Sequence, residues 1–188
     1  MSPLAICSLE VVKYFSLFPA DRLLVLGGMT SGDTKLSSVE YLTFSGSTCA
    51  SPVPDLPTAV RLHSTVMTST SRLVSCGGDT SNGVFTSSCY TWTPGSQSWM
   101  TAPSLSVSIY RGAMVTTEGK IIYIGGYSGS RRDEIYSIDT GLTGQWTQVA
   151  RLTTARMYHR SAASDGDIIT TGIIGRDRQY GDLSLIHI

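Results

Sequence analysis

Pairs of glycines recur at nearly constant spacing, and this recurrence limits the folds open to the chain more than any other feature. Each pair ends a short apolar run, and the three runs are Leu23–Gly28, Leu73–Gly78 and Ile121–Gly126. A fourth run, Ile168–Ile173, has isoleucine where the second glycine would stand. The second position of each pair falls at residues 28, 78, 126 and 173, so the steps are 50, 48 and 47 residues. Such a repeat predicts stacked units that share their cores.

The apolar runs have the length and composition of strands. Ile121–Ile124 is too short for a helix and rich in β-branched residues, which is typical of a strand buried on both faces. Because glycine has no Cβ, a pair at a strand end permits positive φ or the close approach of another backbone. Serine and threonine are abundant and lysine occurs only three times, a composition that favours sheets and turns over helices. The sequence therefore predicts an all-β fold.

Other residues recur in phase with the glycines. A tyrosine follows each pair, and in two repeats a tryptophan follows nine or ten residues after the tyrosine; these residues are Tyr41, Tyr90, Tyr136, Trp99 and Trp146. The first repeat has Cys49–Ala50 in place of the tryptophan. An arginine then comes before the next strand, at Arg61, Arg111 and Arg156.

This order of Gly-Gly, Tyr, Trp and Arg resembles the kelch repeat over roughly residues 11–182. The resemblance implies a partial kelch β-propeller with four-stranded antiparallel blades. It also implies that the tyrosines and tryptophans pack against Gly27, Gly28, Gly77, Gly78, Gly125 and Gly126 and seal one blade to the next. The expected blades are 11–50, with a first strand at 11–18, then 61–100, 110–147 and a partial blade, 158–182, cut off after two strands.

The two ends of the chain are expected to lie outside these blades. Residues 1–10 are either the tail of a preceding blade or wrongly translated sequence. Residues 183–188 resemble one translation of a sequencing-library adapter, so we interpret them as a non-native tail, with an ordinary apolar strand as the alternative. Propellers have about four to eight blades, so the chain is expected to be a truncated record of about half a ring.

Charge and hydropathy exclude several classes of partner. The chain has 14 basic and 14 acidic residues without a long run of either sign, whereas nucleic acids and membrane surfaces require a concentrated positive field. No apolar stretch reaches the roughly 18 residues that a membrane helix needs, so no membrane insertion is expected. A hydrophobic content of 41% and a charged content of 15% predict a globular domain.

Two of the four cysteines are expected to face one another. Cys76 ends the second strand of its unit and Cys89 begins the third, and these strands should be antiparallel neighbours. The pair forms either a disulfide or two buried free thiols. A disulfide and the scarcity of lysine favour an extracellular or secretory location, with a cytoplasmic one as the alternative. Cys7 and Cys49 have no evident partner.

No metal, cofactor or catalytic group is predicted. His63 and His159 occupy strand openings, and a metal site needs three or four converging ligands, so both histidines are interpreted as structural. Kelch-type propellers include copper radical oxidases, and Tyr158–His159 resembles a strand of that family. Its remaining ligands and its cross-linked cysteine–tyrosine pair cannot be identified here. No phosphate-binding loop is present either.

The loops after the glycine pairs are the candidate binding elements. They span 29–38, 79–87 and 127–133, and they differ in length and composition while the flanking strands repeat. The selected residues are Tyr127, Arg131, Arg132, Asp79 and Met29, since tyrosine and arginine are enriched at binding hot spots. Ordinary solvated turns are the alternative, and the arginines before each strand could instead bond to a neighbouring strand.

The predicted function is that of a non-catalytic scaffold that binds another protein. One alternative is a fragment of a propeller enzyme such as a copper radical oxidase. Another is an extracellular carbohydrate-binding module.

Overall fold

The fold is built only of strands in the residues described by the computed structural model, which are 22–43, 46–48, 53–80, 84–164, 166–172 and 182–187. All paired strands are antiparallel, so the prediction of an all-β fold is confirmed. Within these ranges nothing forms a helix long and apolar enough to cross a membrane. The expected first strand at 11–18, residues 1–10, Cys7 and Cys49 lie outside the described residues.

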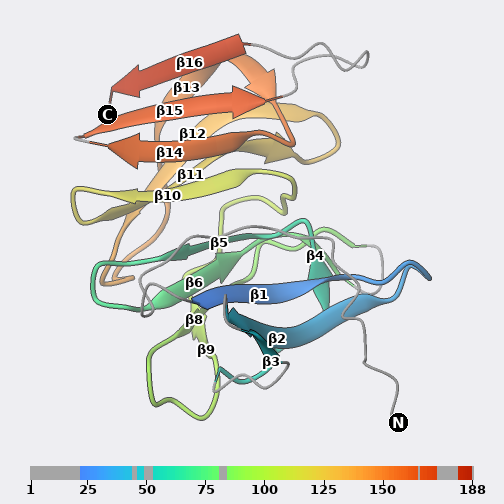
Figure 1. Ribbon diagram of the computed structural model, residues 1–188. Helices are drawn as coiled ribbons and strands as arrows, with labels where there is room; N and C mark the ends of the chain where they lie inside the picture. Colours follow the sequence, from blue (N-terminus) through green and yellow to red (C-terminus); the bar gives the residue numbers. More distant parts are fainter. Residues whose placement is uncertain are drawn as a thin grey trace, which may run out of the picture.

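Four sheets follow one another along the chain (Figure 1). Sheet 1 contains β1 (Arg22–Met29), β2 (Lys35–Thr43) and β3 (Gly46–Thr48). Sheet 2 contains β5 (Ser64–Met67), β6 (Leu73–Cys76), β8 (Cys89–Trp92) and β9 (Met100–Ala102). Sheet 3 contains β10 (Ala113–Thr117), β11 (Lys120–Tyr127), β12 (Arg131–Asp139) and β13 (Thr147–Arg156). Sheet 4 contains β14 (Arg160–Ser164), β15 (Asp167–Gly172) and β16 (Asp182–His187), and a short pair joins β4 (Val60–Arg61) to β7 (Asp79–Thr80).

The last unit has one strand more than the sequence predicted. The expected cut after two strands would leave the edge of β15 open, but β16 pairs along it from Asp167↔His187 to Gly172↔Asp182. Most of the segment interpreted as a non-native tail, 183–188, therefore lies within this strand. An unpaired strand edge offers a row of backbone hydrogen-bonding groups to any extended apolar segment, which accounts for the pairing.

Three hydrophobic clusters fill the spaces between consecutive sheets. Between sheets 1 and 2, Leu24 and Leu26 pack with Leu73, Trp92 and Trp99. Between sheets 2 and 3, the cluster combines side chains of β6 and β8 with those of β10, β11 and β12. Between sheets 3 and 4, it combines side chains of β11 and β12 with Ile168 of β15. No sheet buries its apolar faces alone, so neighbouring units form the core together.

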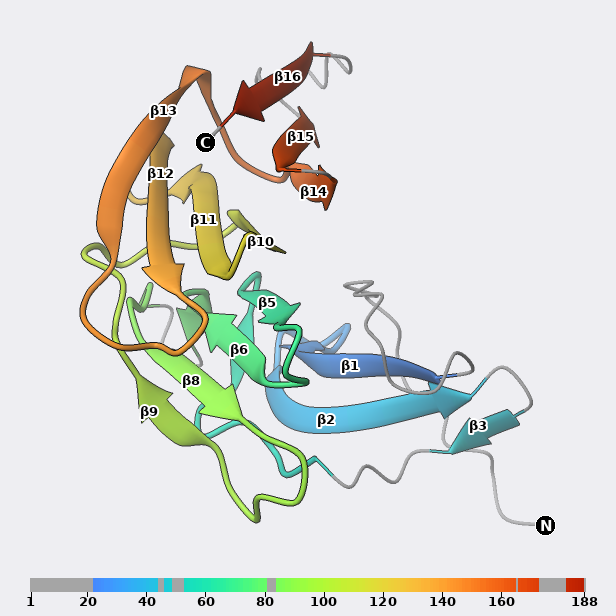
Figure 2. The same ribbon diagram turned by 90° about the vertical axis from the view of Figure 1, so that its left-hand side faces the viewer.

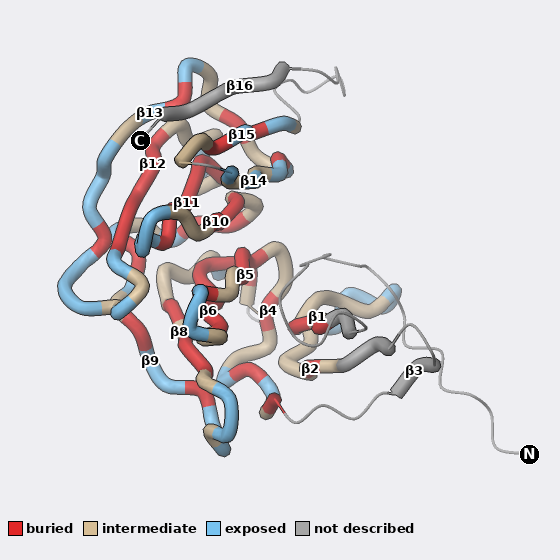
Figure 3. Tube along the Cα trace, turned by 60° about the vertical axis from the view of Figure 1, so that its left-hand side comes forward, coloured by how far each residue is buried: buried red, intermediate tan, exposed pale blue. Residues whose placement is uncertain are grey.

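The first strands of sheets 2, 3 and 4 line one side of the stack. β5 contacts β10 and β10 contacts β14, whereas β9 and β13 lie on the far side of their sheets (Figure 2). Sheet 3 has neighbours on both faces, and the residues 121–124 of β11 have no exposed surface (Figure 3). This agrees with the expectation of a strand buried on both faces.

The glycine pairs have the same backbone conformation in all three sheets. The first glycine has φ of 55°, 69° and 53° at positions 27, 77 and 125, and the second has φ of 110°, 109° and 107° at positions 28, 78 and 126. A Cβ on Gly27 would lie 2.7 Å from the carbonyl oxygen of Val60, and one on Gly125 would lie 2.9 Å from that of Arg156. Glycine is therefore required both for its positive φ and for the close approach of the segment that opens the next sheet.

The tryptophans connect each sheet to the linker before it. Nε1 of Trp99 donates to the carbonyl oxygen of Pro54 at 2.8 Å, and Nε1 of Trp146 donates to that of Pro103 at 2.9 Å. Each indole also belongs to the hydrophobic cluster shared with the preceding sheet. Tyr136 is buried and Tyr90 half-buried in the same clusters, while the side chain of Tyr41 is not among those described.

A disulfide joins β6 to β8. Cys76 and Cys89 are register partners whose Cα atoms are 4.2 Å apart, and both are fully buried in the cluster between sheets 2 and 3. Of the two states that the sequence left open for this pair, the structure has the disulfide.

Candidate functional site

Three of the five residues selected from the sequence come together at one end of the sheets. Met29, Asp79 and Tyr127 each follow a glycine pair directly. We call the end of the sheets where the glycine pairs lie the doublet end. The segment that opens each sheet reaches the same end, because Arg61 pairs with Asp79 and Tyr110 pairs with Tyr127. Loop residues and strand openings therefore form one site.

Backbone hydrogen bonds connect the strand openings of consecutive sheets. The amide of Arg111 donates to the carbonyl oxygen of Leu62 at 2.9 Å, and the amide of Tyr158 donates to that of Arg111 at 3.0 Å. All three residues are in the left-handed region, with φ of 56°, 61° and 57°. This conformation is uncommon for residues other than glycine, and its repetition identifies Leu62, Arg111 and Tyr158 as equivalent positions.

The three arginines at strand openings are consequently not equivalent. Arg111 occupies the left-handed position itself, whereas Arg61 comes one residue before it and Arg156 two residues before it. Sequence spacing alone grouped them together. The side chains differ accordingly: that of Arg156 is fully buried, whereas Arg61 and Arg111 are partly exposed.

Arg61 has its charge compensated. Its Nε donates to Oδ2 of Asp79 at 2.7 Å, Asp33 lies 3.8 Å from its Nη1, and the Sδ of Met29 lies 2.6 Å from that nitrogen. The hydrogen bond that Arg61 donates to Asp79 raises the pKa of Arg61 above its usual value. Lys35 also approaches Asp79, at 3.8 Å. Arg61 is thus bonded to a neighbouring strand, which was one of the two roles foreseen for these arginines.

Arg111 lies among aromatic rings instead. Its guanidinium carbon is 4.4 Å from the ring centre of Tyr110 and 4.3 Å from that of Tyr158. Tyr110 is held in turn by Phe85, stacked at 4.1 Å, and by Tyr127, edge-on at 5.5 Å. Burial raises the pKa of the Tyr110 phenol, and the positive charge of Arg111 opposes this rise. Sequence reasoning did not select Tyr110, Tyr158 or Phe85, although the first two lie beside the arginine and histidine noted at the strand openings.

The other two selected residues belong to sheet 3. Arg131 pairs with Tyr127 through the backbone at the start of β12. Arg132 donates to Oε1 of Glu134 at 2.6 Å, and Arg151 bonds to Asp133 at 2.7 Å beside them. Arg132 is therefore part of an ion-pair network along β12 and β13.

His63 and His159 pack against glycines of the preceding sheet. Cε1 of His63 lies 3.2 Å from the Cβ position of Gly27, and Cε1 of His159 lies 3.0 Å from that of Gly125. Desolvation lowers the pKa of each imidazole to about 4, and for His159 the charge of Arg156 adds to the effect. Both histidines are neutral at physiological pH and fill space between sheets. Among the described residues no group of three His, Cys, Asp or Glu side chains could hold a metal ion.

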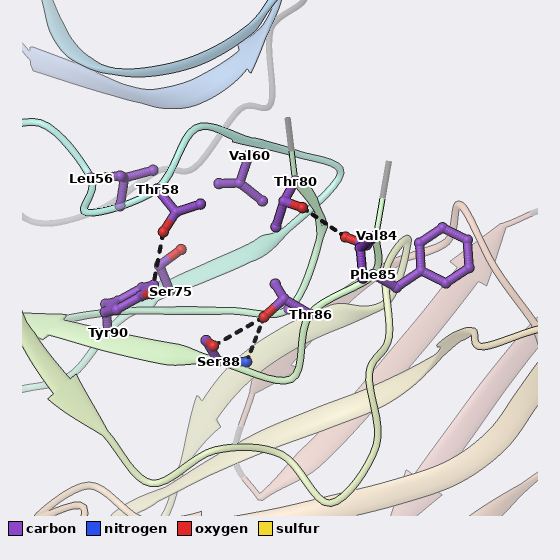
Figure 4. A pocket seen from close by; sticks show the side chains of 11 residues that line it. Leu56, Thr58, Val60, Ser75, Thr80, Val84, Phe85, Thr86, Ser88 and Tyr90 are labelled. Atoms are coloured by element: carbon purple, nitrogen blue, oxygen red, sulfur yellow. Dashed lines mark hydrogen bonds between the residues drawn. The ribbon is translucent and has the colours of Figure 1, made fainter. Parts of the chain in front are cut away.

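A pocket of about 400 Å³ opens beside the doublet end (Figure 4). The polar side chains that line it all carry hydroxyl groups, including Thr58 and Tyr90, whose oxygens are 3.4 Å apart. Phe85 also lines it, but its ring points away from those hydroxyls and stacks on Tyr110. The pocket thus adjoins the aromatic cluster around Arg111.

Comparison with known proteins supports the fold and leaves the family open. No protein-family model and no curated protein matches the sequence. Among solved structures, that of YjhT superimposes with a TM-score of 0.67 at 16% sequence identity. The match covers 80% of this chain and 56% of YjhT, so the chain spans little more than half the length of that protein. At this identity the likeness concerns the fold alone.

Proposed function

We propose that the chain is a set of kelch-type β-propeller blades and that it acts as a non-catalytic scaffold that binds another protein at the doublet end. The likeness to kelch repeats in the sequence supports this assignment. Sheets stacked in chain order, with their first strands adjacent, are the arrangement that such blades require.

One observation supports the binding role above all others. The backbone hydrogen bonds from Arg111 to Leu62 and from Tyr158 to Arg111 hold successive side chains on a common surface. Tyr158 has 42% of its surface exposed although Arg111 packs on its ring. Exposed tyrosine beside arginine on a rigid backbone is the composition typical of binding hot spots. The variable loops that follow the glycine pairs border this surface.

The test compares affinity capture by three forms of the protein. The first is unaltered, the second carries Tyr158→Ser, and the third carries Arg151→Gln on the outermost strand of sheet 3. We expect a defined set of proteins to bind the first and third forms and to be lost from the second. If Tyr158→Ser, shown to be folded by its circular dichroism, captures the same proteins as the unaltered chain, the doublet end is not the binding surface.

A further inference from the structure

Arg111 has an unusual combination of contacts. Two tyrosine rings hold its guanidinium from different sheets, and its Nε atom is buried without a hydrogen-bond partner among the described residues. Among the residues that the structure describes, no carboxylate lies within ion-pair distance of the Arg111 guanidinium. The other contact of the group is weak, from Nη1 to the Sδ of Met157 at 3.9 Å.

Arg61 shows what a structural arginine at this end looks like. It belongs to the preceding sheet and is bonded to Asp79, with Asp33 and Met29 around it. Buried donors are normally paired, because an unpaired one loses its bonds to water without replacement. Arg111 differs from Arg61 in having no carboxylate beside it among the described residues, so its charge is left for a group from outside the chain.

We propose that Arg111, with Tyr110 and Tyr158, forms a binding site for a carboxylate, supplied by an aspartate or glutamate side chain of the partner protein. This inference rests on the proposed function, because it assigns the chemistry of the group that the doublet end recognises. The planar guanidinium matches a carboxylate through paired hydrogen bonds.

Two features of the site favour binding. The rings on Arg111 fix its side chain before the partner arrives, so less rotational freedom is lost on association. The charges close to Arg111 also favour an anion, since the carboxylates of Asp33 and Asp79 are paired with Lys35 and Arg61 and leave the charge of Arg111 uncompensated. A net positive field attracts an acidic segment although the whole chain is neutral.

The experiment is an NMR titration that follows the ring signals of Tyr110 and Tyr158. The probes are two terminally blocked alanine peptides, one with a central glutamate and one with a central glutamine, together with free succinate. We expect the glutamate peptide to shift both ring signals saturably and to bind about tenfold more tightly than the glutamine peptide.

Variants assign the effect to Arg111. Arg111→Gln should abolish the preference for glutamate. Arg111→Lys should weaken it, because lysine keeps the charge and loses the planar fork. Arg151→Gln serves as the matched control, since it removes an arginine that is 55% exposed and paired with Asp133, and it should leave the preference intact. Urea unfolding of each variant establishes that it is folded under the titration conditions.

Three results would overturn the inference. One is equal binding of the glutamate and glutamine peptides, and another is an unchanged preference in folded Arg111→Gln. The third is tighter Arg111-dependent binding of succinate than of the glutamate peptide, which would identify a small-molecule acid as the ligand. In each case the capture experiment with Tyr158→Ser still decides the proposed function separately.

Discussion

Sheets 2 and 3 have the same architecture but fill equivalent positions with different side chains. In sheet 2, His63 opens the sheet and Ser75 lies in its second strand, whereas sheet 3 has Gly112 and Tyr123 at those positions. The hydroxyl of Tyr123 lies 3.4 Å from the Cβ position of Gly77, and His63 lies against Gly27 in the same way. A ring therefore covers the first glycine of the preceding sheet in both cases, but it comes from the residue before the first strand in sheet 2 and from the second strand in sheet 3.

The exchange shows that both interfaces have the same space beside the first glycine, although different side chains fill it. A Cβ on Gly112 would lie 2.5 Å from Cε1 of Tyr123, so a histidine and a tyrosine cannot both be present. Sheet 4 resembles sheet 2, with a histidine and a small residue, His159 and Thr170, at the two positions. Large and small residues alternate between the two strands because interiors are close-packed.

The sharpest test of this comparison transfers the sheet 2 pair into sheet 3. Gly112→His alone should lower the free energy of unfolding by about 3 kcal/mol or more, because its side chain overlaps the ring of Tyr123. Tyr123→Ser alone should cost a similar amount by leaving a cavity. The double variant should recover at least about 2 kcal/mol relative to the sum, measured by urea unfolding. Strictly additive effects would show that the two positions do not share one space.

The second test concerns the disulfide, since the positions of Cys76 and Cys89 are occupied in sheet 3 by the paired residues Ile124 and Ile135. Reduction should lower the free energy of unfolding by about 3 kcal/mol, because the bond closes a loop with a sequence separation of 13. Replacing both cysteines by valine should make stability insensitive to reductant. If the urea midpoint of the unaltered protein is the same with and without reductant, the prediction is contradicted.

The third test uses pH, because sheets 2 and 4 have a buried histidine at the opening position and sheet 3 has none. The stability of the chain should therefore depend on pH through these two histidines. The pKa of His63 and of His159 is about 4 in the folded protein, against a usual 6.5, so the unfolded chain binds more protons between these values. Protonation of the unfolded chain therefore costs no stability above about pH 6.5 and lowers the free energy of unfolding as the pH falls toward 4. The loss is about 2 kcal/mol for each histidine at about pH 5. His63→Gln should remove roughly half of this dependence in urea titrations at several pH values. Equal pH dependence with and without His63 would contradict it.

The smallest expected effect concerns the two arginines. Asp79→Asn removes the counter-ion of Arg61 and makes its environment more like that of Arg111. The glutamate peptide should then bind roughly threefold more tightly, and added salt should reduce the gain. Asp139→Asn is the control, because Asp139 pairs with Lys120 at the opposite end of β11. A gain of the same size in both variants would show that overall charge, and not the doublet end, controls binding.

The features that repeat are the ones the sequence could predict. Gly77, Trp99 and their equivalents recur because stacked sheets make the same close contact in each unit, and periodicity reveals such contacts directly. The antiparallel pairing of Cys76 with Cys89 followed from the same repeat, which places the two residues at the end of one strand and the start of the next.

The candidate site depended on details that periodicity does not carry. Arg61, Arg111 and Arg156 look alike in spacing, but a shift of one or two residues relative to the left-handed position gives each a different environment. Phe85 and Tyr158 belong to separate units, and only the folded chain brings both to Arg111 and Tyr110. Long-range neighbours of this kind leave no local signal in a single sequence.

The backbone bonds between strand openings have a consequence for how such a surface can change. The hydrogen bonds from Arg111 to Leu62 and from Tyr158 to Arg111 run between main-chain atoms, so this backbone link places few demands on the side chains there. A leucine, an arginine and a tyrosine are all accommodated. New specificity can therefore arise by single replacements at these openings while the scaffold beneath stays the same.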